Sequence, residues 1–145
     1  MRFLLQRVTR ASVHIDGNLQ AEIGPGLLVL VGIAGTDTTA QADYLVDKMV
    51  NLRVFPDTAG KMNLSALDTR ASLLLVSQFT LYGDCRKGRR PGFDAAAPAA
   101  KALELYEYVL TKARATGLVT QTGVFQAHME VELVNDGPVT LMLES

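Results

Sequence analysis

The sequence predicts an α+β domain (α/β in some classification schemes) in which mainly antiparallel strands are covered by two helices. Three kinds of segment lead to this prediction. Apolar and polar residues alternate with period two near both ends of the chain, apolar runs fill 27–33 and 71–81, and apolar stripes with helical spacing follow Thr38 and Pro98. A length of 145 residues suits one domain spanning 1–145.

A hairpin is expected near the N-terminus. Segments 11–15 and 19–23 alternate in polarity, and residues 16–18 between them favour a tight turn. After the turn at 24–26, residues 27–33 are apolar at both alternating positions, which predicts a strand buried on both faces.

Two helices are expected to cover the strands. Thr38 and Gln41 have the spacing of a capping box. The apolar stripe that follows comprises Ala42, Leu45, Val46, Met49 and Val50. The second helix begins near Pro98 and ends at Gly117. Its stripe comprises Ala102, Leu103, Tyr106, Val109, Leu110 and Ala113.

The remaining strands are expected in the second half of the chain. Residues 71–81 form a long buried strand, 125–133 alternate like a half-buried strand, and 139–143 form a last strand after the turn-prone residues 135–138.

Composition narrows the class of protein. Apolar residues make up 48% of the chain and charged residues 20%, which is typical of a globular protein. The formal net charge of −1 gives no overall attraction to nucleic acid or acidic membranes, so contact with a polyanion needs a local patch. A single cysteine, Cys85, excludes an internal disulfide. Residues 1–7 lack the pattern of a signal peptide and 27–34 are too few to cross a bilayer, so we expect a cytoplasmic protein without membrane contact.

The first candidate for chemistry is the stretch Ser77-Gln78-Phe79-Thr80 at the end of a predicted buried strand. Strand alternation places Ser77 and Phe79 on one face, and Gln78 and Thr80 on the other. A glutamine and a threonine on one face can orient a polar substrate, but neither is a good general base at neutral pH. The alternative interpretation is plain hydrogen bonding at a strand end.

A second candidate is Gly137-Pro138, just before the last strand. A Gly-Pro step is usually a turn, but an X-Pro bond is also where a cis peptide is accessible. A rigid cis step would hold its carbonyl groups in a fixed direction.

Other polar residues give weaker signals. Four positive charges fall within residues 86–90: Arg86, Lys87, Arg89 and Arg90. They form either a solvated loop or a phosphate-binding loop. His14 and His128 fall on the polar phase of alternating segments, which favours surface positions. The spacing of His, Cys and carboxylate residues does not predict a metal site, and no phosphate-binding or dinucleotide-binding fingerprint is present, so no metal and no cofactor are expected.

The two polar stretches, 77–80 and 135–140, resemble the signature motifs of the D-aminoacyl-tRNA deacylases, the D-tyrosyl-tRNA(Tyr) deacylase family. The resemblance covers nearly the whole chain. It includes segments 6–8, 60–65, 86–91 and 129–131. Two motifs in the right order and at the expected separation make the match specific.

The resemblance implies a three-layer β/β/α fold with mainly antiparallel sheets and two covering helices, assembled as a homodimer. It implies hydrolysis of the ester bond of D-aminoacyl-tRNA, and removal of glycine from mischarged tRNA(Ala). It further implies a cis Gly137-Pro138 step that inserts into the partner subunit's site and leaves no room for an L side chain. Such a filter acts by steric exclusion and would admit many D-amino acids.

The resemblance also implies roles for single residues. Backbone N–H groups around Phe79 and Thr80 would stabilise the oxyanion, and Gln78 and Thr80 would position the terminal adenosine and the scissile carbonyl. In the chiral filter, Arg7 supports the Gly137-Pro138 loop. The other residues implied for substrate binding are Val139, Thr140, Phe125, Ala127 and Met129. Gln126 stands where the family more often has glycine.

Alternatives remain at two levels. For the mechanism, either the 2′-hydroxyl of the terminal adenosine assists the attack of water, or Thr80 is a covalent nucleophile. For the function, the alternatives to a deacylase are a non-catalytic tRNA- or RNA-binding module that uses loop 86–90, and a purely structural dimer. The near-neutral net charge argues against strong RNA affinity, since affinity rises with the number of phosphates neutralised.

Overall fold

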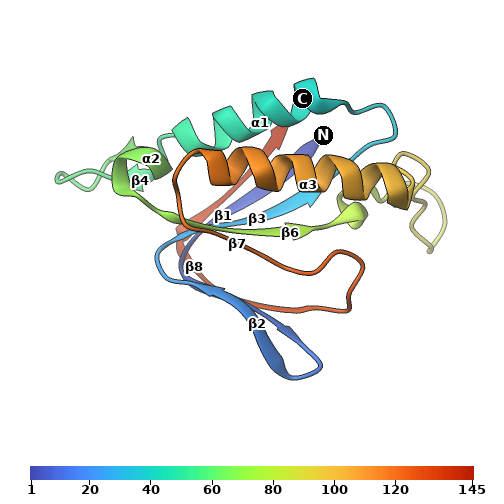
Figure 1. Cartoon of the computed structure of the whole chain (residues 1–145), viewed down its shortest axis with the longest axis horizontal. Helices are drawn as coiled ribbons and strands as arrows, with labels where there is room; N and C mark the ends of the chain where they lie inside the picture. Colours follow the sequence, from blue (N-terminus) through green and yellow to red (C-terminus); the bar gives the residue numbers. More distant parts are fainter.

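Residues 1–145 are all described by the computed structural model, which folds into a mixed, nearly closed six-stranded sheet with helices packed on one side (Figure 1). The α+β class is therefore confirmed. The elements in chain order are β1 (Arg2–Ile15), β2 (Asn18–Ile23), β3 (Gly26–Gly32), α1 (Thr39–Asn51), β4 (Phe55–Pro56), β5 (Met62–Leu64), α2 (Ala66–Thr69), β6 (Ser72–Ser77), the 3-10 turn η1 (Phe79–Tyr82), α3 (Ala99–Ala115), β7 (Thr120–Thr122) and β8 (Glu130–Glu144).

The long strand β1 makes the sheet bend round on itself. Its first half, from Arg2 to Val8, pairs with β3, its last residues pair with β2, and β8 runs antiparallel along both halves. Because β2 and β8 curve beneath the rest of the sheet, β2 comes into contact with β6 and β7 (Figure 1). The pairs β3–β6 and β6–β7 are parallel, so the sheet is mixed, with antiparallel pairing confined to β1 and its three neighbours.

Two hydrophobic cores lie on opposite faces of β3 and β6. Val29 and Val31 belong to the larger core beneath α1 and α3, whereas Leu28 belongs to the smaller core inside the curl of the sheet. The predicted burial of this strand on both faces is thereby confirmed, because alternate side chains of β3 enter different cores. The smaller core also takes Met129, which ties the 124–129 segment to the sheet.

Helix α1 forms where the capping pattern predicts it. The Thr38 side chain accepts a hydrogen bond from the backbone N–H of the helix start, and the Gln41 side chain accepts one from the Thr38 N–H at 2.8 Å. All five residues of the predicted stripe are buried. The hairpin is also confirmed: β1 and β2 pair with Val13 opposite Ala21.

Helix α3 is confirmed with one correction in its stripe. Tyr106, Val109, Leu110 and Ala113 are buried, and Gly117, with φ of +80°, ends the helix. Leu103 was predicted to be buried but is 38% exposed, and Leu105 is buried instead. Leu105 lies four residues before Val109, so it shares that face of the helix, while Leu103 turns toward solvent.

Several predicted strand boundaries are wrong. The strand predicted over 71–81 ends at Ser77 and continues as a 3-10 turn. Residues 125–129 keep the alternating burial of a strand but pair with no neighbour. In contrast, 130–144 form one strand, because residues 135–138 make a bulge in β8 instead of a turn between two strands.

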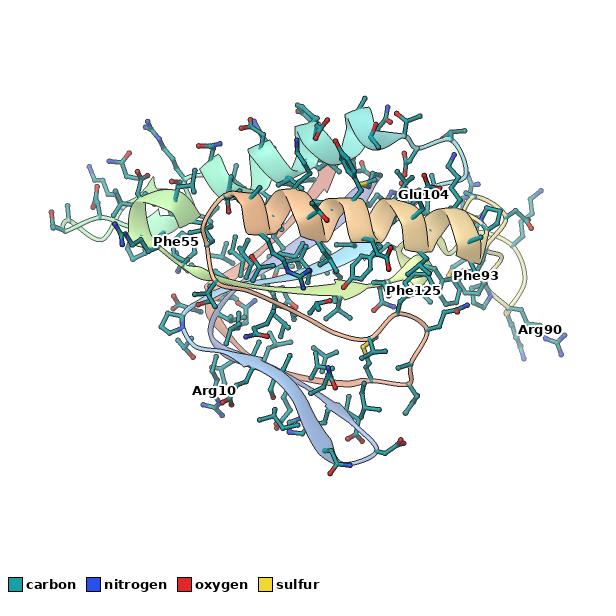
Figure 2. All side chains as sticks on the ribbon, in the orientation of Figure 1. Arg10, Phe55, Arg90, Phe93, Glu104 and Phe125 are labelled. Atoms are coloured by element: carbon teal, nitrogen blue, oxygen red, sulfur yellow. The ribbon has the colours of Figure 1, made fainter.

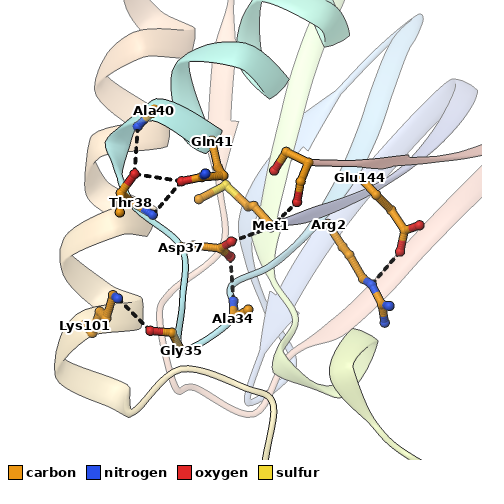
Figure 3. A network of polar contacts seen from close by, with 11 residues as sticks. Met1, Arg2, Ala34, Gly35, Asp37, Thr38, Ala40, Gln41, Lys101 and Glu144 are labelled. Atoms are coloured by element: carbon orange, nitrogen blue, oxygen red, sulfur yellow. Dashed lines mark hydrogen bonds and ion pairs between the residues drawn. The ribbon is translucent and has the colours of Figure 1, made fainter.

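Polar contacts hold the start of β1 against the loop before α1 (Figure 3). The α-amino group of Met1 is buried and lies 2.6 Å from one carboxylate oxygen of Asp37, whose other oxygen accepts a hydrogen bond from the Ala34 N–H at 2.6 Å. Arg2 forms an ion pair with Glu144 at 2.6 Å on the adjacent strand. None of the three helices has the length and apolar character needed to cross a membrane.

Candidate active site

The first motif lies where the chain leaves the sheet. Ser77 ends the buried strand β6, and the Gln78 N–H donates to the carbonyl of Val31 at 2.8 Å before η1 begins. Gly32 allows this turn to pack closely, since a Cβ there would meet the Cβ of Leu81 at 3.0 Å. The first two N–H groups of a 3-10 turn have no acceptor within the turn, and in η1 these belong to Phe79 and Thr80.

The chain turns at Phe79 instead of continuing as a strand, yet Gln78 and Thr80 lie together as predicted. The Gln78 side-chain amide donates a hydrogen bond to Oγ1 of Thr80. Phe79 and Thr80 are both exposed, Phe79 by 57%. The Phe79 ring packs edge-on against Phe93, with ring centroids 4.9 Å apart.

A cavity of about 570 Å³ opens beside this motif. Its walls bring together Ser77, Gln78 and Phe79 from the first motif with Phe125, Ala127 and Met129 from the segment before β8. Eleven of its 15 lining residues are hydrophobic, and His128 is the one ionisable residue among them. The cavity can therefore enclose an apolar or aromatic group while a few polar groups at its edge orient it. Thr80 is not among the lining residues, and it reaches the site through Gln78.

Packing contacts hold in place the segment 123–129, which forms one wall of the cavity. Gly123 leaves room for Met129, whose sulfur would lie 2.6 Å from a Cβ at that position. Phe125 packs against Tyr106 with ring centroids 6.0 Å apart, and the buried Tyr106 hydroxyl donates to the Leu75 carbonyl at 2.9 Å. Burial raises the pKa of Tyr106, so its hydroxyl remains a donor. In Figure 2, Phe125 lies beneath the N-terminal half of α3, at the same end of the molecule as Phe93.

The second motif forms the bulge in β8. The Gly137-Pro138 peptide is cis, as predicted, and Gly137 adopts φ of +127°, a conformation that L side chains rarely take. Asn135 clamps the bulge: its side-chain oxygen accepts from the Val139 N–H at 2.9 Å, and its amide donates to the Val139 carbonyl at 3.2 Å. Thr140 also accepts from the Asn135 amide, at 3.1 Å.

Arg7 anchors the bulge from the neighbouring strand β1. It is only 9% exposed, and its Nε lies 3.0 Å from a carboxylate oxygen of Asp136. The same guanidinium donates to the backbone carbonyl of Val54, in the loop after α1. Its Nη2 would lie 3.1 Å from a Cβ on Gly137, so the guanidinium fills the space next to this glycine.

The two motifs lie apart within one chain. Arg7, beside the bulge, pairs with Leu27 at the start of β3, whereas Ser77 pairs with Val31 near its end. Four residues of strand separate these positions by about 13 Å. Gly137 and Pro138 are exposed and do not line the cavity.

The basic segment forms a closed loop after η1. Asp84 and Gly92 exchange two backbone hydrogen bonds at 2.8 and 2.9 Å, which close the loop. Arg86 donates to the Asp84 carboxylate at 2.7 and 2.8 Å, and these bonds hold the pKa of that carboxyl below its ordinary value. Three cations of the loop have no carboxylate partner: Lys87, Arg89 and Arg90. Arg90 projects away from the protein (Figure 2).

Several residues that line the cavity were not predicted from the sequence. Ala99 and Ala102 line the cavity from the start of α3, and Ala97 lines it from the loop just before the helix. The alanine-rich stretch 95–100 was the signal for a surface that other groups approach closely. Gln126 lines the cavity with φ of +62°, in the left-handed region that favours glycine. His128, predicted at the surface, is exposed but stands at the cavity. No three His, Cys or carboxylate side chains cluster as a metal site.

Comparison with known proteins places these motifs in a family. A family model described as D-Tyr-tRNA(Tyr) deacylase matches residues 4–144. Relatives named D-aminoacyl-tRNA deacylase occur in Geotalea uraniireducens (54% identical, covering 100% of this chain and 94% of the relative) and Koribacter versatilis (56% identical, 100% and 97%).

Two solved structures share the architecture. One, described as a c-Myc DNA unwinding element binding protein, superposes with a TM-score of 0.95 at 43% identity and covers 100% of this chain and 99% of that one. The other, described as a probable eukaryotic D-amino acid tRNA deacylase, has a TM-score of 0.86 at 16% identity, covers 98% and 97%, and supports the fold alone. From the family match and the full-length identity of these relatives, the chain belongs to the D-aminoacyl-tRNA deacylase family.

Proposed function

We propose that this protein is a hydrolase that cleaves the ester bond of D-aminoacyl-tRNA in the cytoplasm, releasing the free D-amino acid and tRNA, and that residues 1–145 form one deacylase domain. The observation that carries the proposal is the first motif at the mouth of a preformed cavity, in a chain 54% identical over its full length to a protein named D-aminoacyl-tRNA deacylase. A volume of about 570 Å³ falls within the range of small-molecule sites.

The terminal adenosine and its amino acid are the groups that the cavity receives. Its apolar walls suit an adenine ring, and the side chains of Ser77 and Gln78 supply polar groups at the edge. The N–H groups of Phe79 and Thr80, unused within η1, support a role in stabilising the oxyanion that forms at the ester carbonyl. One such donor is commonly worth about 10²–10³ in rate.

Water is the nucleophile in the mechanism that we favour. Its oxygen attacks the ester carbon, the bond from that carbon to the ribose oxygen breaks, and the proton released from water passes to the ribose oxygen. In this mechanism the 2′-hydroxyl of the adenosine, a neighbour of the ester on the same ribose, relays that proton. Thr80 is less suited to act as a covalent nucleophile, because its hydroxyl contacts the Gln78 amide and no side-chain base.

Selection against L-amino acids is assigned to Gly137-Pro138 of a second copy of the chain. The exposed bulge, clamped by Asn135 and Arg7, lies away from its own cavity, which supports a homodimer in which each bulge completes the partner's site. A wall of backbone atoms excludes an L side chain by collision and leaves the D side chain free. Glycine has no side chain to collide, so glycyl-tRNA(Ala) is also a substrate.

The alternative is a non-catalytic tRNA- or RNA-binding module. The three unpaired cations of loop 84–92 favour contact with phosphates, and such contact also serves an enzyme that acts on tRNA. Phosphate contact is therefore expected for both functions, and only hydrolysis of the ester distinguishes the enzyme from the binding module.

The test is hydrolysis of D-Tyr-tRNA and L-Tyr-tRNA by the purified protein in the presence of a chelator. We expect rapid loss of the D-ester alone. Hydrolysis of neither ester by the folded protein would overturn the deacylase and leave the binding module. Loss of both esters at similar rates would overturn the chiral filter and keep the hydrolase.

A further inference from the structure

A second cavity adjoins the end of η1, whereas the first adjoins its start. Its volume is about 640 Å³, and its walls include Arg2, Tyr82, Asp84, Arg86 and Asp94. In contrast to the apolar cavity at Gln78, it presents aromatic, cationic and anionic groups together. None of these residues lines the first cavity.

A phenylalanine ring connects the two cavities. Phe93 packs on Phe79, which lines the first cavity, and its ring would lie 3.2 Å from a Cβ on Gly83, which lines the second. The four residues of η1 carry Phe79 at one end and Tyr82 at the other. One turn of chain therefore separates a residue that lines the first cavity, Phe79, from one that lines the second, Tyr82.

Tyr82 is a fixed aromatic platform. The Arg2 guanidinium lies over its ring, 4.6 Å from the centroid, and donates to the Leu81 carbonyl at 2.7 Å. The Arg2 Nε also forms an ion pair with Glu144 at 2.6 Å (Figure 3). Burial raises the pKa of Tyr82 to about 12, so its hydroxyl stays a neutral donor throughout the physiological range.

The remaining groups match a nucleotide. Asp94 forms no ion pair, and a free carboxylate accepts hydrogen bonds from the exocyclic amino group of cytosine. Lys87, Arg89 and Arg90 stand on the adjoining loop with no carboxylate partner. Aromatic faces flanked by unpaired cations are the usual construction of sites for single-stranded nucleic acid.

We propose that this second cavity is a subsite for the cytidine nucleotides that precede the terminal adenosine of the tRNA acceptor end. A cytosine stacks on the Tyr82–Arg2 platform and donates its amino group to Asp94, while the loop cations contact the phosphates. This inference rests on the proposed function, because the terminal adenosine must occupy the first cavity.

The test compares a substrate that reaches the subsite with one that does not. We expect Tyr82→Ala to raise KM for D-Tyr-tRNA on the order of ten-fold with kcat retained, since stacking on one aromatic ring is worth about that much. Hydrolysis of D-tyrosyl-adenosine, which lacks the preceding nucleotides, should not change. Tyr82→Phe keeps the ring and should restore most of the affinity. Tyr44→Ala, at an exposed tyrosine on α1, is the matched control.

A binding measurement keeps the subsite testable without catalysis. The trinucleotide C-C-A should bind the wild-type protein more tightly than adenosine, with the advantage lost in Tyr82→Ala and reduced for U-U-A. If Tyr82→Ala changed the hydrolysis of D-Tyr-tRNA and of D-tyrosyl-adenosine equally, the subsite would be overturned. Equal binding of C-C-A and adenosine to the wild-type protein would overturn it as well. If the wild type hydrolyses neither D-Tyr-tRNA nor D-tyrosyl-adenosine, the proposed function fails, and the trinucleotide titration alone decides the subsite.

Discussion

The two motifs of this chain are built by different means. The stretch from Ser77 to Thr80 is positioned by the backbone, through the end of β6 and the turn η1, and it faces a cavity of its own chain. The bulge at Gly137 is positioned by side chains, through the Asn135 clamp and the buried Arg7, and it faces outward. Under the proposed function, the group that receives the substrate is thus built into the fold, whereas the group that reaches a second copy of the chain is held by side chains behind it.

This comparison predicts different responses to substitution. Side-chain replacements should damage the bulge, because side chains hold it. The first motif should tolerate loss of a side chain, because its N–H groups come from the backbone.

Gly137→Ala should have the largest effect on function. The new Cβ would lie 2.8 Å from Cγ2 of Val139 and 3.0 Å from its backbone nitrogen, at φ of +127°. The bulge must shift, and we expect the ratio of D- to L-Tyr-tRNA hydrolysis rates to fall by more than ten-fold. Single-turnover deacylation of both esters measures this ratio.

The matched control for this variant is Gly24→Ala. Gly24 also lies in a turn, but it has no neighbour within 4 Å of the added Cβ and no positive φ. The ratio of D- to L-Tyr-tRNA hydrolysis rates and the melting temperature of Gly24→Ala should match those of the wild type. If Gly137→Ala keeps the wild-type ratio of D- to L-Tyr-tRNA hydrolysis rates, the bulge is not the chiral filter.

Arg7→Met should cost the most stability. The variant leaves the buried Val54 carbonyl without its donor and removes the ion pair with the half-exposed Asp136. An unsatisfied buried acceptor costs about 1–3 kcal/mol, so we expect the free energy of unfolding to fall by about 2 kcal/mol. Urea denaturation measures the loss.

Arg10→Met provides the control on the same strand, since Arg10 is exposed and makes no ion pair. Its effect should stay within about 0.5 kcal/mol. Equal stability of Arg7→Met and Arg10→Met would mean that Arg7 does not hold the bulge.

The sequence predicts the structure correctly where local signals decide it. The capping box of Thr38 and Gln41 and the alternation around the first hairpin act over a few residues, so α1 and the β1–β2 pair follow from the sequence. The cis step and the approach of Phe125, Ala127 and Met129 to the first motif follow from the family resemblance, which carries information about packing that the spacing does not hold.

The strand boundaries predicted from the sequence are wrong where tertiary packing decides the structure. Apolar residues continue past Ser77, yet the strand ends there, because after the last ladder bond, from the Gln78 N–H to the Val31 carbonyl, the chain turns over Gly32 into η1. Residues 125–129 alternate as a strand does, but no neighbouring strand is placed to pair with them. Periodicity reports which side chains are buried and not which backbone groups are paired.

The paired variant Arg89→Ala and Arg90→Ala should have a moderate effect on substrate affinity. Both side chains are exposed and unpaired, so their charges are available to phosphates. We expect KM for D-Tyr-tRNA to rise several-fold, and the slope of log KM against log salt to fall by about one to two units. The exposed Lys61, on the loop before β5, is the control site, and Lys61→Ala should leave the salt slope unchanged. An unaltered slope in the double variant would leave loop 84–92 without a role in tRNA binding.

Thr80→Ala should have the smallest effect, although Thr80 belongs to the more conspicuous motif. The substitution removes the hydroxyl that accepts from Gln78 but retains the N–H groups at the start of η1. We expect kcat for D-Tyr-tRNA to fall by less than ten-fold. Loss of a covalent nucleophile would instead abolish turnover, as removal of the serine from a hydrolase triad does, by a factor of about 10⁶. A fall of that size, with the fold intact by circular dichroism, would make Thr80 the nucleophile and reverse the contrast between the two motifs. Retained activity would place the oxyanion donors in the backbone, where no side-chain substitution can remove them.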